Sequence, residues 1–161
     1  MSEPTKKLIN NPDNIITEVI TGMILAHPNH LFVEGDTGRA IVAKNGPRKG
    51  KVGVVIGGGS GHEPAFAGYV GRGLADAAPV GNIFASPSPA QILDAGYAAD
   101  SGAGVVFLFG NYTGDVMNFN MAVETMAKNG VNARSFVVTD DIASAPASMA
   151  HERRGIAGDF F

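Results

Sequence analysis

Residues 52–64 have the sequence Val-Gly-Val-Val-Ile-Gly-Gly-Gly-Ser-Gly-His-Glu-Pro. The apolar run at 52–56 is typical of a buried strand, and four of the next five residues are glycines. Glycines let the backbone adopt positive φ and let a ligand come close to the main chain. His62 ends the turn with an imidazole, the side-chain group that exchanges protons most readily near neutral pH. Because open α/β sheets build binding crevices at such strand ends, this stretch predicts a ligand site.

Strand, turn and helix patterns alternate along the rest of the chain. Apolar runs bounded by turn residues predict strands at 31–33, 39–43, 51–56, 77–80, 104–109 and 134–138. Helical spacing and capping signals predict helices that begin at Asn11, Ser88 and Asp115, a short helix over 64–70, and another that begins at His151. Pro79 predicts either that its strand lies at an edge of the sheet or that the strand begins at this proline.

This alternation predicts a single α/β domain over residues 1–161. We expect a parallel or mixed sheet flanked by helices, with right-handed crossovers. The ligand site is expected at the C-terminal ends of the strands.

Composition narrows the class of protein. The chain has 161 residues, of which 45% are hydrophobic and 17% charged. This length and composition suit one domain with a hydrophobic core. The net charge of −3 and the absence of a basic stripe argue against a nucleic-acid partner. No apolar run reaches the roughly 18 to 20 residues of a membrane span, and no secretory signal is visible. The sequence has no cysteine, which is compatible with the cytoplasm.

Three polar positions follow separate predicted strands. They are His62, Asp115 and the adjacent pair Asp140/Asp141. The carboxyl ends of parallel strands meet at one edge of a sheet, so these groups could face one ligand. An imidazole and a carboxylate there could move protons. Asp140 and Asp141 make a weak metal pair, because neighbouring side chains of an extended segment point to opposite faces, and no metal site is expected.

Each of these features also has a purely structural interpretation. The glycines could serve a tight turn alone, His62 could pack locally, and the N-terminus of a helix would favour a carboxylate at Asp115. Known glycine motifs do not fit either. The Lys-Ser/Thr pair of a phosphate loop is missing, and His62 stands where dinucleotide-binding and hydrolase motifs need a glycine. The residues alone leave open whether the turn binds a ligand.

Several stretches together resemble the dihydroxyacetone kinase family, specifically the N-terminal part of its substrate-binding (K-type) subunit or domain. The matching stretches occur in the same order over nearly the whole chain, at residues 6–10, 26–28, 57–64, 86–89, 111–119 and 153–158. The glycine–histidine turn and the Asn-Tyr-Thr-Gly-Asp turn at 111–115 are highly specific in combination.

The resemblance implies phosphorylation of dihydroxyacetone, a small hydroxyketone. It implies that Gly59, Ser60 and Gly61 hold the substrate and that His62 and Asp115 are its acid–base groups. A second histidine of the family forms a covalent hemiaminal with the ketone carbon. The phosphoryl group would come from a nucleotide-binding domain or subunit that carries magnesium with ATP, or with ADP recharged from phosphoenolpyruvate, so that this chain binds no cofactor itself. A cytoplasmic homodimer is also implied.

Two departures from the family pattern matter. Family members are longer, and their hemiaminal histidine corresponds to a position beyond Phe161, so we expect a fragment that lacks the second part of the site and is inactive alone. The family's lysine before the Asn-Tyr-Thr-Gly-Asp turn is replaced by Gly110. The lost cation and the opened space suggest a larger ketose, such as the four-carbon erythrulose.

Two functions of other classes stay open. The chain could be a non-catalytic ketose sensor that contacts a regulator. It could also be a phosphocarrier in which His62 is itself phosphorylated.

Overall fold

The computed structural model describes residues 7–159. Its helices are α1 (Ile15–Ala26), α2 (Pro89–Ala99) and α3 (Thr113–Lys128). Its strands are β1 (Leu31–Glu34), β2 (Ala40–Ala43), β3 (Gly53–Ile56), β4 (Gly58–Ser60), β5 (Ala77–Ile83), β6 (Val105–Gly110) and β7 (Ala133–Val138). The short 3-10 helices are η1 (Pro12–Asn14), η2 (Ala67–Tyr69), η3 (Ala147–Glu152) and η4 (Ala157–Asp159). No helix within 7–159 is long and apolar enough to cross a membrane.

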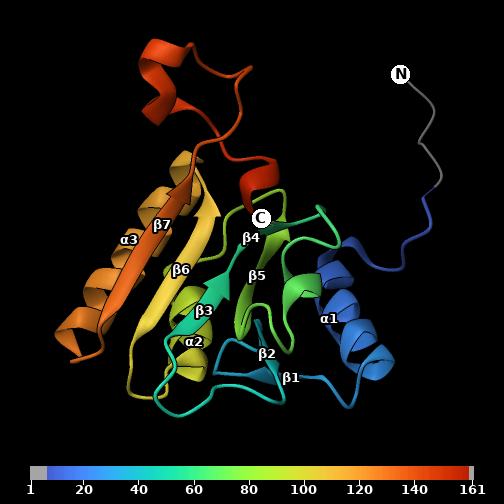
Figure 1. Cartoon of the computed structure of the whole chain (residues 1–161). Helices are drawn as coiled ribbons and strands as arrows, with labels where there is room; N and C mark the ends of the chain where they lie inside the picture. The colour runs from blue at the N-terminus through green and yellow to red at the C-terminus, as the bar shows by residue number, and fades with distance from the viewer. Residues whose placement is uncertain (1–6, 160–161) are drawn as a thin grey trace.

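The strands form one mixed seven-stranded sheet in the order β1-β2-β5-β3-β6-β7, with β4 paired to β5 (Figure 1). β1 pairs antiparallel with β2, and β2 with β5. β3, β5, β6 and β7 run parallel, so their C-terminal ends meet at one edge. The predicted mixed α/β fold is therefore confirmed.

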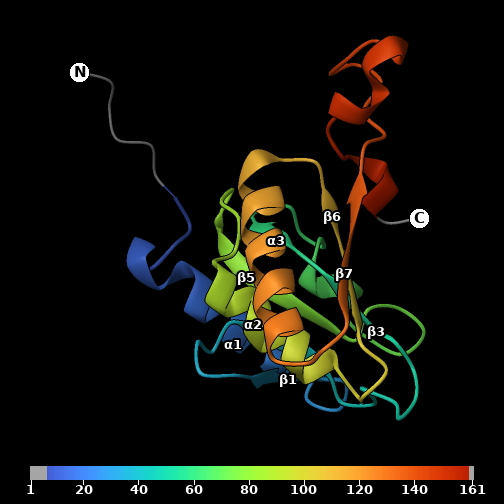
Figure 2. The ribbon, with the colours of Figure 1, turned by 90° about the vertical axis from the view of Figure 1, so that its left-hand side faces the viewer.

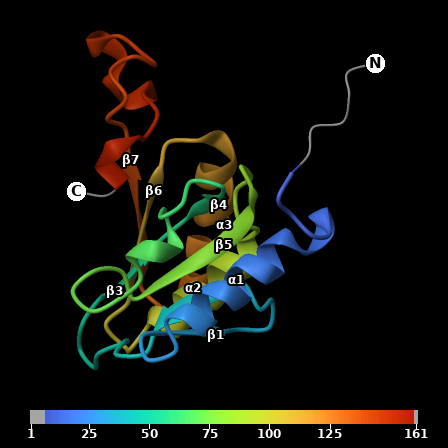
Figure 3. The same cartoon turned by 90° about the vertical axis from the view of Figure 1, so that its right-hand side faces the viewer.

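Helices cover both faces of the sheet. α2 and α3 lie on one face (Figure 2) and α1 lies on the other (Figure 3). The α2/α3 side holds the larger aromatic core, where Phe119 of α3 stacks on Phe109 of β6 with ring centroids 4.3 Å apart. Ile16 and Ile20 of α1 pack on the opposite face. The sheet is thus buried from both sides, as the nearly continuous apolar run of β6 predicts.

Capping residues define the helix ends that the sequence predicts. The Asn11 side chain accepts the Asp13 N–H at the start of η1, which leads into α1. Ser88 and Gln91 form a reciprocal capping box at the start of α2. Gly130, with φ of +80°, follows the end of α3. These predictions are confirmed.

The helix predicted over 64–70 is wrong. This region is irregular apart from the 3-10 turn η2. Gly68 lies inside the segment and Gly71 directly follows it, and glycine costs about 1 kcal/mol per residue in a helix. The apolar residues of the short segment 64–70 do not offset that cost.

Both positions predicted for Pro79, in an edge strand or at the start of its strand, are also wrong, because β5 begins at Ala77. β5 lies between β2 and β3, and Pro79 is fully buried. The parallel partner of β5 changes beside it, from Val55 of β3, opposite Ala77, to Gly58 of β4, opposite Val80. The missing N–H of proline therefore falls in a break of the ladder, where it costs no hydrogen bond.

The helix predicted from His151 is wrong for the residues that are described. η3 ends at Glu152, the chain extends from Arg153, and only the short turn η4 follows. Gly155 and Gly158 pack too tightly for side chains, since a β-carbon on Gly158 would lie 2.6 Å from Val138 Cγ1. Phe160 and Phe161 lie outside the described residues.

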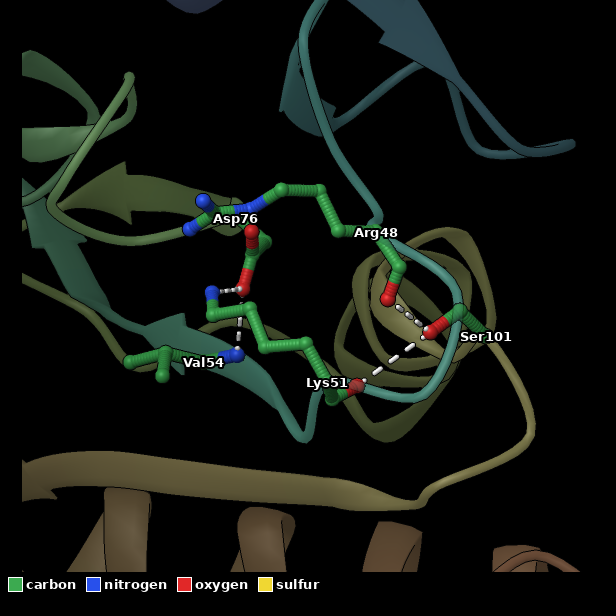
Figure 4. A network of polar contacts seen from close by, with 5 residues as sticks. All are labelled: Arg48, Lys51, Val54, Asp76 and Ser101. Atoms are coloured by element: carbon green, nitrogen blue, oxygen red, sulfur yellow. Dashed lines mark hydrogen bonds and ion pairs between the residues drawn. The ribbon is translucent and has the colours of Figure 1, made fainter.

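A polar network ties the N-terminal ends of β3 and β5 together at the edge opposite the predicted site (Figure 4). Buried Asp76 pairs with Lys51 at 2.5 Å and accepts the Val54 N–H at 2.8 Å. The Ser101 hydroxyl donates to the carbonyl oxygens of Arg48 and Lys51 at 2.7 and 3.2 Å. These contacts hold the strand that leads to the glycine turn.

Candidate functional site

A cavity of about 590 Å³ lies where the segments that follow β3, β5 and β6 meet. Its wall includes Gly59 and His62 from the glycine turn, Phe84 after β5, and Asp115 after β6. The C-terminal turn η4 closes one side, at the end of the sheet toward which β6 and β7 point (Figure 1). Three segments that are distant in sequence thus converge on one space, as parallel topology dictates.

The glycine turn fits closely between neighbouring segments. A β-carbon on Gly58 would lie 2.1 Å from Phe66 Cε2, and one on Gly59 would lie 2.6 Å from the Ala85 nitrogen. Gly61 has φ of +99°. Tight packing therefore explains these glycines in part, independently of any ligand.

The turn presents only some of its residues to the cavity. Gly59 and His62 line it, whereas Ser60 and Gly61 are not part of its wall. The buried Ser60 hydroxyl donates to the Gly81 carbonyl at 2.8 Å, and the Gly61 N–H donates to Glu63 Oε2 at 3.0 Å. The Ser60 hydroxyl and the Gly61 N–H are therefore engaged within the protein.

His62 lies between two aromatic rings. Its imidazole makes edge contacts with Phe84 and Phe66, at centroid distances of 5.1 and 6.2 Å. Phe84 has φ of +50°, a left-handed conformation that is costly for a bulky residue. Such strain is often found at functional sites. The sequence reasoning missed Phe84, because nothing in the pattern marks a left-handed phenylalanine.

Asp115 lies in the first turn of α3, where the helix N-terminus favours its charge. Its Oδ1 atom is buried and finds no hydrogen-bond partner among residues 7–159. Burial raises the pKa of Asp115, and a hydrogen bond with the Ser86 side chain and the attraction of charged His62 oppose that rise. His62 and Asp115 line the same cavity, at the strand ends where the sequence places them.

A second carboxylate in the wall was missed by the sequence reasoning. Asp159, in η4, is 5% exposed, and its Oδ1 is unpartnered within the described chain. Burial, together with the charges of Asp140 and Asp115, raises the pKa of Asp159 to about 6. The only signal available was its place directly after the stretch 153–158, in a segment that was expected to form a helix.

Gly110 and Tyr112 complete this side of the cavity. A β-carbon on Gly110 would lie 3.2 Å from Asp159 Oδ2 and 3.0 Å from Tyr112 Cε2. The Tyr112 hydroxyl donates to the Gly155 carbonyl at 2.9 Å, and burial raises the pKa of that phenol. The absence of a side chain at position 110 keeps the space in front of Asp159 open.

Asp140 and Asp141 have structural partners outside the cavity. Asp140 accepts the N–H groups of Ile156 and Gly158 at 2.7 and 2.8 Å, and these bonds lower its pKa. Asp141 accepts the Ala143 N–H at 2.9 Å. Within residues 7–159, no cluster of three or more histidine, cysteine or acidic residues could hold a metal ion.

Comparison with known proteins identifies the family. The family model described as the Dak1 domain matches residues 21–161. This chain belongs to the Dak1 domain family. The resemblance drawn from the glycine–histidine and Asn-Tyr-Thr-Gly-Asp turns is therefore confirmed.

Among curated relatives of this Dak1 chain, the dihydroxyacetone-binding subunit of PTS-dependent dihydroxyacetone kinase 1 from Listeria innocua is 46% identical over 153 residues. The match covers 95% of this chain and 46% of that protein. A D-erythrulose kinase from Mycolicibacterium smegmatis is 51% identical over 154 residues, covering 96% of this chain and 26% of that protein. The chain thus spans less than half the length of these relatives.

Solved structures share the fold. The dihydroxyacetone kinase of C. freundii, in complex with AMP-PNP and Mg²⁺, matches with a TM-score of 0.87 and 38% identity, over 97% of this chain and 29% of that one. A dihydroxyacetone kinase operon co-activator matches with a TM-score of 0.78 and 36% identity, over 88% of this chain and 43% of that one. These similar structures include a protein named as a kinase and a protein named as an operon co-activator.

Proposed function

We propose that this chain provides the ketose-binding site of a dihydroxyacetone-type kinase, which transfers a phosphoryl group to a hydroxyl of a small ketose. The observation that carries the proposal is the meeting of His62 and Asp115 in one cavity of a Dak1 domain. The names of the relatives, as dihydroxyacetone-binding subunits and erythrulose kinases, support the substrate class.

In this mechanism His62 is the general base. A neutral hydroxyl is a weak nucleophile, so the imidazole takes its proton as the phosphorus–oxygen bond forms. Asp115 attracts the resulting imidazolium, and its raised pKa makes it a better proton acceptor than an ordinary carboxylate. Gly59 presents its backbone to the cavity. The remaining part of phosphoryl transfer is positioning and charge neutralisation.

The phosphoryl donor belongs on a separate domain or subunit. No lysine or arginine of the described residues lines the cavity, and its ionisable groups are His62, Tyr112, Asp115 and Asp159. Without a cationic side chain, and with two carboxyl groups in its wall, the cavity is a poor site for the negatively charged phosphates of a nucleotide. Its ionisable groups suit an uncharged polyhydroxy compound instead. ATP, or ADP recharged from phosphoenolpyruvate, is expected on the partner.

The test uses the full-length enzyme with its nucleotide-binding partner and compares His62→Ala with His151→Ala. His151 is exposed and lies outside the cavity. We expect His62→Ala to lower kcat for dihydroxyacetone by about 10²- to 10⁴-fold, and His151→Ala to leave kcat unchanged. Equal activity of the two variants would contradict the proposal. Residues 1–161 alone, with ATP and ketose, are expected to show no turnover.

A ketose sensor is the second candidate, because one structural relative is named as an operon co-activator. A sensor would bind ketose in the same cavity and would show no phosphoryl transfer in its wild-type form. Calorimetric titration with dihydroxyacetone, alongside the turnover assay, separates the two functions. Assembly as a homodimer in the cytoplasm stays a prediction from the resemblance, and sedimentation of the full-length protein tests the dimer.

A further inference from the structure

Asp159 is a buried carboxylate without a protein partner. It is 5% exposed, and its Oδ1 finds no hydrogen bond anywhere in residues 7–159. A buried charge is normally paired or hydrogen-bonded, and an exception calls for an explanation. Asp159 also lies in the wall of the cavity that holds His62 and Asp115, so a ligand in that cavity would lie against its carboxyl group.

The turn that carries Asp159 is held firmly in place. Asp140 accepts two of its backbone N–H groups, from Ile156 and Gly158, at 2.7 and 2.8 Å. The Tyr112 hydroxyl donates to the Gly155 carbonyl at 2.9 Å. These contacts fix η4 to the ends of β6 and β7, so that the carboxylate is placed before a ligand arrives. Such preorganisation favours specific recognition.

Gly110 leaves the space beside Asp159 Oδ2 free of a side chain. A β-carbon at position 110 would lie 3.2 Å from Asp159 Oδ2, so a longer side chain would stand in front of the carboxylate. Both residues line the same wall. Asp159 has an unpartnered carboxyl oxygen, and Gly110 beside it has no side chain. Together they leave room for an additional polar group of a ligand.

We propose that Asp159 is a specificity-determining residue that accepts a hydrogen bond from the hydroxyl on the fourth carbon of a ketose, a group that dihydroxyacetone lacks, and that it thereby favours a four-carbon ketose over dihydroxyacetone. The inference rests on the proposed function and names its substrate more narrowly. An ionised carboxylate only accepts hydrogen bonds, and an O–H···O⁻ bond is about twice as strong as a neutral one. The pKa of about 6 keeps Asp159 mostly ionised at neutral pH.

The chemistry of the cavity suits a neutral polyol at this position. A hydroxyl on the fourth carbon would satisfy the carboxylate, whereas a smaller ketose would leave it unpaired or hydrated. Losing a hydrogen bond to a charged group costs roughly 1.5–3 kcal/mol, which corresponds to a roughly 10- to 150-fold change in kcat/KM.

The experiment measures kcat/KM for dihydroxyacetone and for each enantiomer of erythrulose with the full-length enzyme and its nucleotide-binding partner. The variants are Asp159→Ala and Asp159→Asn, with Glu152→Gln as the control. Glu152 is exposed, lies on the same C-terminal segment and is outside the cavity wall. Thermal unfolding of each variant shows whether the fold is retained.

We expect Asp159→Ala to lower the erythrulose-to-dihydroxyacetone ratio of kcat/KM by at least tenfold for the preferred enantiomer, Asp159→Asn to lower it less, and Glu152→Gln to leave it unchanged. An unchanged ratio in both Asp159 variants, or an equal loss for both substrates, would overturn the role of Asp159 while leaving the kinase intact. If the wild-type enzyme phosphorylated neither ketose, the proposed function would fail first and this proposal with it.

Discussion

Gly155 packs directly on Gly110: a β-carbon built on Gly155 would lie 2.6 Å from the Gly110 α-carbon. The contact joins the C-terminal segment to the end of β6, and it brings Asp159 into the wall shared with Asp115. Two positions without side chains are therefore what allows the C-terminal turn to close the cavity.

This contact predicts that Gly155→Ala is destabilising. The added methyl group must push the C-terminal segment away from β6, at a cost of about 1–3 kcal/mol. Urea unfolding measures the loss. The matched control is Gly22→Ala, because Gly22 lies in α1 with nothing within 4 Å of its added β-carbon. That change should stabilise the protein by up to about 1 kcal/mol. Two changes of the same sign would contradict the packing described here.

Asp115→Asn is expected to lower kcat by about 10²-fold or more, because the amide neither accepts a proton nor attracts an imidazolium at His62. KM for the ketose should change less than kcat. Steady-state kinetics of the full-length enzyme provide the measurement. Glu124→Gln removes an exposed carboxylate from the same helix and should leave both constants unaltered. A comparable loss in the two variants would argue against a catalytic role for Asp115.

Gly110→Lys should shift substrate preference toward dihydroxyacetone. The new side chain would start 3.2 Å from Asp159 Oδ2, so its ammonium can pair with that carboxylate and fill the space in front of it. We expect the erythrulose-to-dihydroxyacetone ratio of kcat/KM to fall by about tenfold, since an ion pair removes one charged acceptor. Gly110→Ala separates the added volume from the added charge and should shift the ratio less. A ratio that rose in the lysine variant would contradict this reading of position 110.

The pH dependence of stability should reveal the buried carboxyl of Asp159. Its pKa of about 6 in the folded protein exceeds the ordinary 3.8, so the folded state binds the proton more tightly than the unfolded state. Stability from this group is therefore complete below about pH 4 and is lost as pH rises toward and through 6. Asp159→Asn should equal the wild type near pH 4 and exceed it at pH 7.5, by about 1–2 kcal/mol after screening in the open cavity.

Denaturant unfolding at the two pH values tests this difference. A variant that is less stable than the wild type at pH 7.5 would mean that the ionised carboxylate has a stabilising partner. The opposing effect of Asp140, whose pKa is lowered by backbone N–H groups, is present in both proteins.

Asp76→Asn is expected to destabilise the fold without touching the site. The change weakens the contacts to the Lys51 ammonium and to the Val54 N–H in the network of Figure 4. Leaving a buried donor poorly satisfied costs about 1–3 kcal/mol. Urea unfolding, with the exposed Asp36→Asn as the comparison, gives the size of the effect. Ketose KM should stay the same at a temperature where the variant is folded.

Local sequence signals predicted the elements that depend on local physics. The capping residues Asn11 and Ser88 mark helix starts, and the apolar run of β6 marks a strand buried from both faces. The parallel order of strand ends was enough to predict that His62 and Asp115 could face one ligand, and both line one cavity. Each of these inferences rests on contacts within a few residues or on a rule of topology, and a shared ligand for His62 and Asp115 stays a prediction.

The parts that sequence reasoning missed depend on distant contacts. Pro79 fits a central strand only because β4 takes over the pairing beside it. Asp159 enters the site only because Gly155 can approach Gly110. The left-handed Phe84 beside His62 likewise follows from tertiary packing. None of these relationships leaves a periodic pattern in the chain.

The most direct test of the proposed ketose site is a crystal structure of the full-length protein soaked with dihydroxyacetone. We predict electron density for the ketose within hydrogen-bonding distance of both the His62 imidazole and the Asp115 carboxylate. Ketose bound elsewhere, with the space between these two side chains filled only by water, would contradict it.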